Sequence, residues 1–532
     1  MRLGIDFGTT RIVVALVDRG NYPVISFETP QGERSGWYPP LVAVRGAERR
    51  YGWEAWESQQ EAGWTIIRSL KRYLEDAGPH TILEIAGERV RMLELLTELA
   101  ASLKAALAER STLEAPAGEP LEVMLGVPAN ANGNQRFLTV EGFRRAGFEV
   151  LGLLNEPSAA SIEFVHANQG KLPVRGKGML LVYDLGGGTF DASLVSAEER
   201  QFCVIASEGI PTLGGDDFDN LLAEMALEEA GIGAAERDAL TQAQWFRLHE
   251  ECRQKKEALH PNTRRITVDL GTVDPNWEPV TLAVDAFYER CRPLVDETVL
   301  AVEDLLRARQ AEPDLLYVTG GGSELPLVPR ALREVFGRRV RRSTYMYSAT
   351  AIGLAIQADE QAGYVLRDTF TRYFGVWREA DCGRTIVFDP LFAKGTPLPV
   401  PGEANLRVSR RYRPAHNVGH FRYLECSHRA EDGRPLGDIT IWDEILFPFD
   451  PAWRDRSDLA SAPIERWEGA WSQEIEESYS CSAGGVVTVE IANLTAGYRR
   501  TYQLGRWAVP SEPIVPGKGK DRRRRRRAAG RG

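Results

Sequence analysis

Two segments of the 532-residue chain follow one plan, in which an apolar run ends in aspartate and then turns through glycine and threonine. The first reads L-G-I-D-F-G-T-T-R-I-V-V-A-L-V over residues 3–17, and the second L-V-Y-D-L-G-G-G-T-F-D-A-S-L-V over residues 181–195. Glycine lets backbone N–H groups approach an anion closely and adopt positive φ, and threonine adds a hydroxyl donor. The repeat therefore predicts a duplicated domain that binds phosphate between its halves.

The residues expected to contact phosphate are Gly8, Thr9, Thr10, Gly186, Gly187, Gly188 and Thr189. Asp6 and Asp184 stand just before the two turns, where a carboxylate would repel phosphate unless a cation intervened. Mg²⁺ suits this position because it keeps several waters and takes one or two carboxylates together with phosphate oxygens. The alternative is a pair of ordinary β-hairpin turns with aspartate as a turn residue.

These turns resemble the nucleotide site of the actin-like ATPase superfamily. N-E-P-S-A-A (155–160) and L-G-G-D-D-F-D (213–219) are similar to segments of its DnaK-type, seventy-kilodalton heat-shock chaperones. The order agrees from residue 1 to about 362, with T-G-G-G-S-E-L-P (319–326) at the adenosine-motif position. The resemblance implies an α/β actin-like ATPase domain with duplicated ribonuclease-H-like halves, an all-β sandwich after it, and ATP or ADP with Mg²⁺ as ligands.

The resemblance also implies roles for single residues. Asp6 and Asp184 resemble the Mg²⁺-site aspartates, and Lys71 resembles the catalytic lysine at the γ-phosphate. Further residues resemble those that place Mg²⁺ and water (Glu156, Thr189, Asp191), contact the nucleotide (Gly214, Gly215, Lys256, Gly320, Gly321, Gly322) or relay its state to the linker (Pro128, Arg136, Asp368, with Glu156). The alternatives are an exposed helix position for Lys71 and for Arg136, and a helix-start carboxylate for Glu156.

The adenosine site departs from the family pattern. Lys256 matches, but Arg253 and His260 stand where the family has an acid and a serine, and Glu257 and Glu324 replace arginines that flank adenine. We therefore predict intact phosphate chemistry with weaker base selectivity.

Two sequence patterns divide the chain. Up to about residue 362, strand-like runs such as 121–127 and 179–184 alternate with helical stretches such as 242–259, as in α/β folds. Another helix is indicated where apolar residues recur at three- and four-residue spacing: Met92, Leu95, Leu96, Leu99, Leu103 and Leu107. Later strands such as 486–491 alternate and favour a sandwich. The predicted divisions are an ATPase domain (1–362), a linker (363–368), a β-sandwich (369–510) and a disordered basic tail (511–532).

The second half resembles the family's peptide-binding domain, in which Phe392 and Leu424 are candidate pocket residues. The resemblance implies a chaperone-like ATPase that couples nucleotide state to unfolded or extended polypeptide, with J-domain and nucleotide-exchange co-chaperones as possible partners. Gly152 replaces an arginine that meets the J-domain in relatives, the helical lid is not found, and Arg367 interrupts the apolar linker. The alternatives are an actin-like-fold kinase or a scaffold that uses ATP without chaperone activity.

Composition excludes other classes. No apolar run reaches eighteen residues, and the six scattered cysteines form no disulfide framework, so we expect a cytoplasmic protein without a membrane span. From Lys518 onward nine Lys/Arg and one Asp give a local charge of +8 in a chain of net charge −10. Binding of nucleic acid is therefore expected only through this tail. His416, His420, Cys426 and His428 form a candidate zinc cluster, with core or surface roles as the alternative.

Overall fold

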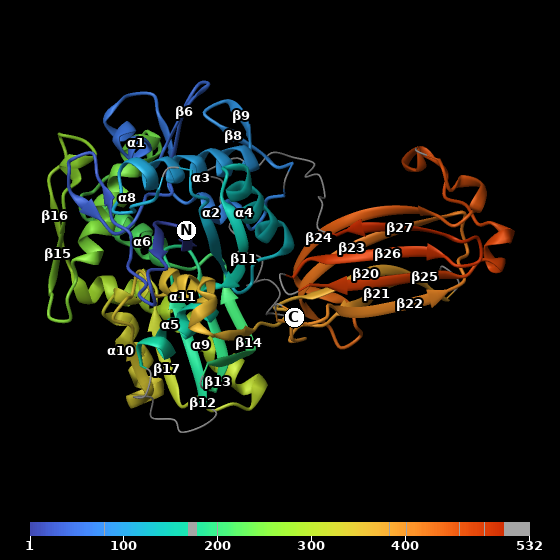
Figure 1. Ribbon diagram of the computed structural model, residues 1–532. Coiled ribbons are helices and arrows are strands. Elements are labelled where there is room, and N and C mark those ends of the chain that lie inside the picture. The colour runs from blue at the N-terminus through green and yellow to red at the C-terminus, as the bar shows by residue number, and fades with distance from the viewer. Residues whose placement is uncertain are drawn as a thin grey trace.

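The computed structural model describes residues 1–504 apart from 79, 117, 169–177, 199, 382–383, 401, 457 and 483–484. An α/β part and an all-β part lie beside each other in Figure 1 and are joined near residue 365. The predicted basic tail (511–532) lies outside the described residues. Within the part of the chain that is described, no helix has both the length and the apolar character needed to cross a bilayer.

The first half of the α/β part is built on a sheet with strand order β11-β10-β1-β2. Strand β1 pairs antiparallel with β2 and parallel with β10. The predicted leucine-rich helix is α3, which buries all six of the expected side chains. The elements of this half are β1 (Arg2–Phe7), β2 (Ile12–Leu16), β3 (Phe27–Glu28), β4 (Arg34–Ser35), β5 (Val42–Arg45), β6 (Glu48–Tyr51), α1 (Gly52–Glu57), β7 (Thr65–Ile67), α2 (Leu70–Tyr73), β8 (Ile82–Ile85), β9 (Glu88–Arg91), α3 (Met92–Glu109), β10 (Glu122–Val127), α4 (Gly133–Arg145), β11 (Glu149–Asn155) and α5 (Glu156–Ala167).

The second half repeats this plan in a sheet with order β18-β17-β12-β13-β14-β19. Strand β12 pairs antiparallel with β13 and parallel with β17, as β1 does with β2 and β10. The two segments noticed in the sequence are therefore equivalent hairpins of two similar sheets. The elements here are β12 (Gly178–Leu185), β13 (Phe190–Glu198), β14 (Gln201–Ile210), α6 (Gly215–Glu229), α7 (Ala234–Asp238), α8 (Gln242–Glu257), β15 (Arg265–Val268), β16 (Val280–Ala283), α9 (Val284–Arg309), β17 (Leu315–Thr319), α10 (Leu327–Phe336), β18 (Val340–Arg342), α11 (Ala349–Ala358) and β19 (Val365–Arg367).

Helices α5 and α11 pack against each other between the two sheets, where glycine permits close approach. A Cβ atom at Gly353 would lie 1.8 Å from the carbonyl oxygen of Ala159, and one at Gly4 would lie 2.3 Å from that of Ala351. Contacts this short exclude any larger side chain at either position. Helix α5, whose first residue is Glu156, is thereby fixed between the halves.

The all-β part is the predicted sandwich. One sheet has the order β21-β20-β23-β24 and the other the order β22-β25-β26-β27. Aromatic and branched side chains of both sheets form a single core. Its strands are β20 (Tyr373–Ala380), β21 (Thr385–Phe392), β22 (Leu406–Tyr412), β23 (Val418–Arg429), β24 (Pro435–Pro448), β25 (Ile475–Cys481), β26 (Val487–Asn493) and β27 (Tyr498–Gln503).

A buried ionic network connects the two sheets of the sandwich. The Glu477 carboxylate, which is fully buried, accepts hydrogen bonds from Arg378 at 3.0 and 2.7 Å. Arg378 also lies 2.6 Å from Asp389, which in turn binds Arg410 at 2.8 Å. A buried carboxylate is tolerated only when it is paired and hydrogen-bonded, so Arg378 is needed to keep Glu477 inside.

The segment predicted as a linker is an edge strand. Strand β19 pairs parallel with the start of β14, with Leu366 opposite Phe202. Leu366 is buried, whereas Arg367 turns outward and lies 2.5 Å from Glu403. The arginine that interrupts the apolar linker therefore avoids the cost of burial by facing outward, where it pairs with a carboxylate.

Candidate nucleotide site

The two predicted phosphate turns have the same backbone hydrogen bond. In the first, Gly8 N donates to the carbonyl of Arg11 at 3.0 Å, and in the second Gly186 N donates to the carbonyl of Thr189 at 2.9 Å. Both turns line one cleft between the halves. The other predicted residues that line it are Asp6, Thr9, Thr10, Lys71, Glu156, Asp184, Gly187, Gly215, Lys256, Gly320, Gly321 and Gly322. Three further predicted residues, Gly188, Asp191 and Gly214, are not among its lining residues.

The expectation that the turn glycines adopt positive φ is wrong. None of Gly8, Gly186, Gly187 and Gly188 does so, and Gly320 alone among the predicted site glycines has a positive φ, of 86°. Their glycine character is instead required by crowding between segments. For example, a Cβ at Gly187 would lie 2.7 Å from the Thr10 side chain.

The third glycine of the second turn and the start of α6 show the same crowding. A Cβ at Gly188 would lie 2.6 Å from Thr9 Oγ1, and one at Gly214 would lie 2.6 Å from Gly188 N. Behind them, Gly215 N donates to the carbonyl of Gly186 at 2.9 Å. These contacts hold the turns of the two halves and the start of α6 together, so the backbone donors share one wall.

A buried lysine and four carboxylates meet at the inner end of the cleft. Lys71 Nζ lies 2.5 Å from Glu156 Oε1. Burial, then the charge of Glu156, raise the pKa of Asp6 and of Asp191 to about 7, although Lys71 opposes both shifts. Burial and the neighbouring carboxylates raise the pKa of Asp184 well above its usual range. One lysine does not balance this cluster, and Mg²⁺, which needs only one or two carboxylates together with phosphate oxygens and water, would suit Asp6 and Asp184 here.

The residue behind the cleft wall, Asp191, is tied to the relay segment. Its Oδ1 accepts a hydrogen bond from Ala129 N at 2.9 Å, directly after Pro128. The Pro128 carbonyl accepts from Ala131 N at 3.0 Å. Pro128 therefore begins a turn that leads from Asp191 to helix α4.

The candidate zinc cluster of the sequence analysis is not a metal site in the described residues. Among the described residues there is no group of three or more His, Cys, Asp or Glu side chains placed to hold a metal ion. Cys426 is buried, His420 lies 3.1 Å from Glu444, and His428 bonds its neighbour Ser427.

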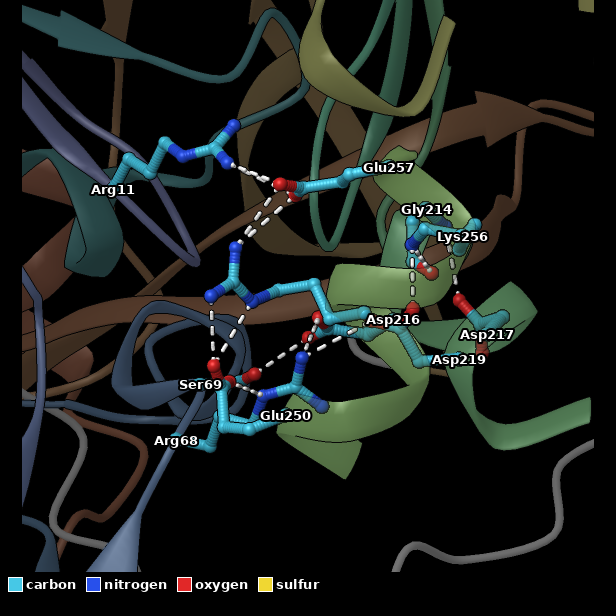
Figure 2. Close-up of polar contacts among 12 residues, drawn as sticks. Arg11, Arg68, Ser69, Gly214, Asp216, Asp217, Asp219, Glu250, Lys256 and Glu257 are labelled. Carbon is cyan, nitrogen blue, oxygen red and sulfur yellow. Dashed lines mark hydrogen bonds and ion pairs between the residues drawn. The ribbon is translucent and has the colours of Figure 1, made fainter. Parts of the chain in front are cut away.

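Polar contacts cross the cleft from the first half to the second (Figure 2). Ser69 Oγ donates to Asp216 at 2.6 Å, and Arg68 lies 3.0 Å from Asp219 and 3.1 Å from Glu250. Burial would raise the pKa of Asp216, but Arg68 and a second arginine nearby lower it overall. Lys256, which the sequence assigned to the nucleotide, donates to the carbonyl of Gly215 at 2.7 Å.

The outer end of the cleft differs from the prediction. Arg253 and Glu257 line it, but His260 is exposed and Glu324 binds Arg342 at 2.8 Å, and neither is a lining residue. Sequence reasoning missed two lining residues here, Arg11 and Tyr347. Arg11 follows the two threonines of the first turn, and this position could have drawn attention to it.

The predicted relay residues meet at an asparagine that the sequence did not single out. Asn155 is fully buried and immediately precedes Glu156. Its Oδ1 accepts from Arg136 at 2.6 Å, and its Nδ2 donates to Asp368 at 2.6 Å. Burial raises the pKa of Asp368, and Arg136 opposes that shift. Glu156 thus contacts Lys71, and the residue before it, Asn155, contacts the linker.

The sandwich contacts the α/β part directly next to this relay. Glu425 of β23 accepts a hydrogen bond from Gly133 N, in the first turn of α4, at 2.5 Å. A carboxylate at a helix N-terminus is favoured by the helix dipole. A Cβ at Gly133 would lie 1.8 Å from Trp442, so the two parts fit closely at this point.

Comparison with known proteins identifies the fold. The family model described as Hsp70 protein matches residues 2–371. A chaperone protein HscA homolog of Chromobacterium violaceum is 32% identical over 389 residues, covering 68% of this chain and 59% of that protein. The chaperone protein HscA of Proteus mirabilis is 32% identical over 385 residues, and that of Escherichia coli O6:H1 is 33% identical over 378.

Each of these two HscA matches covers 68% of this chain and 58% of the relative. The chain therefore spans somewhat under three fifths of the length of the curated relatives it matches. The match includes both phosphate turns, Lys71, the relay residues and the linker strand. The duplicated α/β part is the actin-like ATPase domain of this family, an all-β sandwich follows it, and the chain belongs to the Hsp70 family.

Proposed function

We propose that this protein is an ATP-hydrolysing chaperone that couples nucleotide state to the binding of unfolded or extended polypeptide. The observation that carries the proposal is a series of contacts from Lys71, at the phosphate end of the cleft, to the linker. Lys71 contacts Glu156, the preceding Asn155 contacts Asp368, and the strand that carries the linker pairs with β14. A kinase or a scaffold has no need of such a path.

The residues of the site have separate roles in the transfer of the γ-phosphoryl group to water. Backbone N–H groups of the two turns and the threonine hydroxyls bind the phosphates, and Lys71 stabilises the negative charge on the γ-phosphoryl oxygens. Glu156 and Thr189 orient the attacking water, and Asp191 holds Thr189 from behind the cleft wall. Asp6 and Asp184 would hold Mg²⁺, which neutralises phosphate charge when bound.

The outer face of the β21-β20-β23-β24 sheet supplies the proposed polypeptide site. A small apolar cluster separate from the main core lies on it, formed by Phe388, Leu424 and Cys426 with Tyr373 and Trp377 beside them. Ile439 and Ile441 are paired with Cys426 and Leu424 and remain 52% and 49% exposed. An apolar surface of this kind suits an extended segment with apolar side chains. Leu424 thus stays a candidate, but Phe392 lies in the main core.

The contact path predicts that Asp368→Ala uncouples the two parts. Without the carboxylate, Asn155 loses its hydrogen-bond partner on the linker and the half-buried Arg136 loses a nearby negative charge. We expect basal phosphate release to stay within about twofold, while stimulation by an unfolded peptide falls about tenfold, a typical coupling. Phosphate release with and without peptide measures both, and Asp304→Ala on the surface of α9 is the matched control. Undiminished stimulation in Asp368→Ala would contradict the path.

J-domain and nucleotide-exchange co-chaperones are proposed partners, and Gly152 predicts weak J-domain stimulation. A Cβ at Gly152 would lie 3.4 Å from Met124 Sδ, an ordinary contact, so β11 has room for a side chain. Gly152→Arg should raise J-domain stimulation about two- to fivefold, the value of one exposed charge pair. Gly152→Ala controls for the loss of flexibility. Strong stimulation of the unmodified chain that Gly152→Arg leaves unchanged would refute this prediction.

We also propose a cytoplasmic location. The five described cysteines, Cys203, Cys252, Cys291, Cys426 and Cys481, are free thiols, as expected in a reducing compartment.

The function as a whole is tested by phosphate release from ATP, alone, with an unfolded peptide, and with a panel of sugars. The proposal expects slow release that peptide accelerates and sugars do not change. Transfer of phosphate to a sugar would establish the kinase alternative instead.

A further inference from the structure

The polar groups at the outer end of the cleft differ in kind from those at the phosphate end. Arg11 comes from the first turn, Glu257 and Arg253 from α8, and Tyr347 from the segment before α11. Arg11 and Glu257 face each other from the two sides of the cleft (Figure 2). This end therefore closes on a ligand only when residues of both halves meet.

Arg11 is held in a fixed orientation there. Its Nη2 lies 2.9 and 2.8 Å from the two carboxylate oxygens of Glu257, and its guanidinium carbon lies 4.2 Å from the centre of the Tyr347 ring. The loop that contains Gly321 lies close to both groups. A Cβ at Gly321 would lie 2.7 Å from the Tyr347 ring and 3.5 Å from Arg11 Nη1. A planar guanidinium stacked on an aromatic ring is pre-organised for recognition.

The carboxylate of Glu257 at this end is already occupied by hydrogen bonds. Both carboxylate oxygens of Glu257 also accept hydrogen bonds from Arg253 Nη1, each at 3.2 Å. With the two from Arg11, the carboxylate accepts four hydrogen bonds. A carboxylate has about four lone-pair sites, and these contacts fill them. In contrast, Arg11 Nε is buried and has no acceptor among the described residues. A ligand that reaches this end therefore meets the Arg11 guanidinium, which can only donate, beside a carboxylate that is already occupied.

Purine bases differ in what they present to such a donor. The N7 and O6 atoms of a 6-oxopurine are both acceptors, and arginine binds this pair of atoms well. Adenine presents N7 as an acceptor but a 6-amino group as a donor, which an arginine cannot accept. The observed groups thus favour the 6-oxo edge over the 6-amino edge.

We propose that Arg11 contacts the base and that the cleft binds 6-oxopurine nucleoside triphosphates, GTP and ITP, at least as tightly as ATP. Glu257 acts as a positioning residue that orients the Arg11 guanidinium. The proposal rests on the proposed nucleotide-binding function and adds the class of base to it.

The test is competition of ATP, GTP and ITP for the full chain, measured by displacement of a fluorescent ADP. For the unmodified protein we expect GTP and ITP to compete at least as well as ATP. Arg11→Leu should weaken GTP and ITP about tenfold or more and change ATP much less. Arg253 still neutralises Glu257 in this variant, so the fold should persist. Arg342→Leu, which removes an arginine paired with Glu324 away from the cleft lining, is the matched control.

Three outcomes are distinguishable. Displacement by ATP with thousandfold weaker GTP and ITP would overturn the role of Arg11 and leave the proposed function standing. Equal losses for all three nucleotides in Arg11→Leu would assign Arg11 to the phosphates or to cleft closure and would also overturn it. If the chain binds no nucleotide at all, the proposed function itself fails.

Discussion

Replacing Lys71 with alanine is expected to slow phosphate release from ATP by about 10²–10³-fold, the effect of removing one pre-organised charge from a transition state. Lys71 is buried and lies 2.5 Å from Glu156, so its ammonium group has a fixed position at the phosphate end of the cleft. Burial alone would lower the pKa of Lys71, but Glu156 and Asp6 raise it overall, and the lysine is charged at neutral pH. The charge that the transition state requires is therefore present before nucleotide binds.

The measurement is single-turnover phosphate release, accompanied by binding of fluorescent ADP to show that the cleft still forms. Lys255→Ala is the matched control, because Lys255 precedes Lys256 on α8 and pairs with Glu251 outside the cleft. A variant that binds nucleotide and turns over at the unmodified rate would remove Lys71 from the reaction. Loss of nucleotide binding as well would instead show that Lys71 mainly holds the carboxylate cluster together.

The second large effect concerns the sandwich. Arg378→Met should lower the free energy of unfolding of this domain by about 3–5 kcal/mol, because it leaves the buried Glu477 without its arginine. Arg410→Met is the matched control. Asp389 keeps Arg378 in that variant, so we expect a loss of about 1 kcal/mol or less.

Hydrogen exchange of the full chain separates this effect from the ATPase domain. Peptides from β22 and β25 should lose protection in Arg378→Met, and peptides from β1 and β12 should keep it. Equal and small losses of protection in the two arginine variants would show that the other neighbours of Glu477 are sufficient to stabilise its buried carboxylate.

Motifs in the sequence led to the residues of the two turns, which line one cleft in the structure, because each turn is a short segment. The outer end could not be predicted in this way. Arg11 and Glu257 are separated by 246 positions, and their contact depends on how the two halves close. Asn155 lay inside a quoted motif, but its partners Arg136 and Asp368 are 19 and 213 positions away. Side-chain pairing across the fold decides such roles.

The proposed polypeptide site shows a second reason why the sequence alone does not place every side chain. Alternation along a strand assigns side chains to faces, but an extra residue in a bulge reverses the assignment beyond it. The register shifts between Phe374 and Gly375 and again between Tyr423 and Leu424. At the first shift the extra residue on β21 lies between Pro390 and Phe392, so Phe388 is on the outer face and Phe392 is in the core, and no local pattern announces the change.

The central claim is that nucleotide state controls polypeptide binding through the linker, and peptide dissociation measures this most directly. A fluorescent unfolded peptide bound to the full chain is chased with unlabelled peptide in ATP and in ADP, for the unmodified protein and for Asp368→Ala. The account predicts dissociation rates that differ about tenfold between the two nucleotides and that become similar in the variant. Equal dissociation rates in ATP and ADP for the unmodified protein would contradict the account.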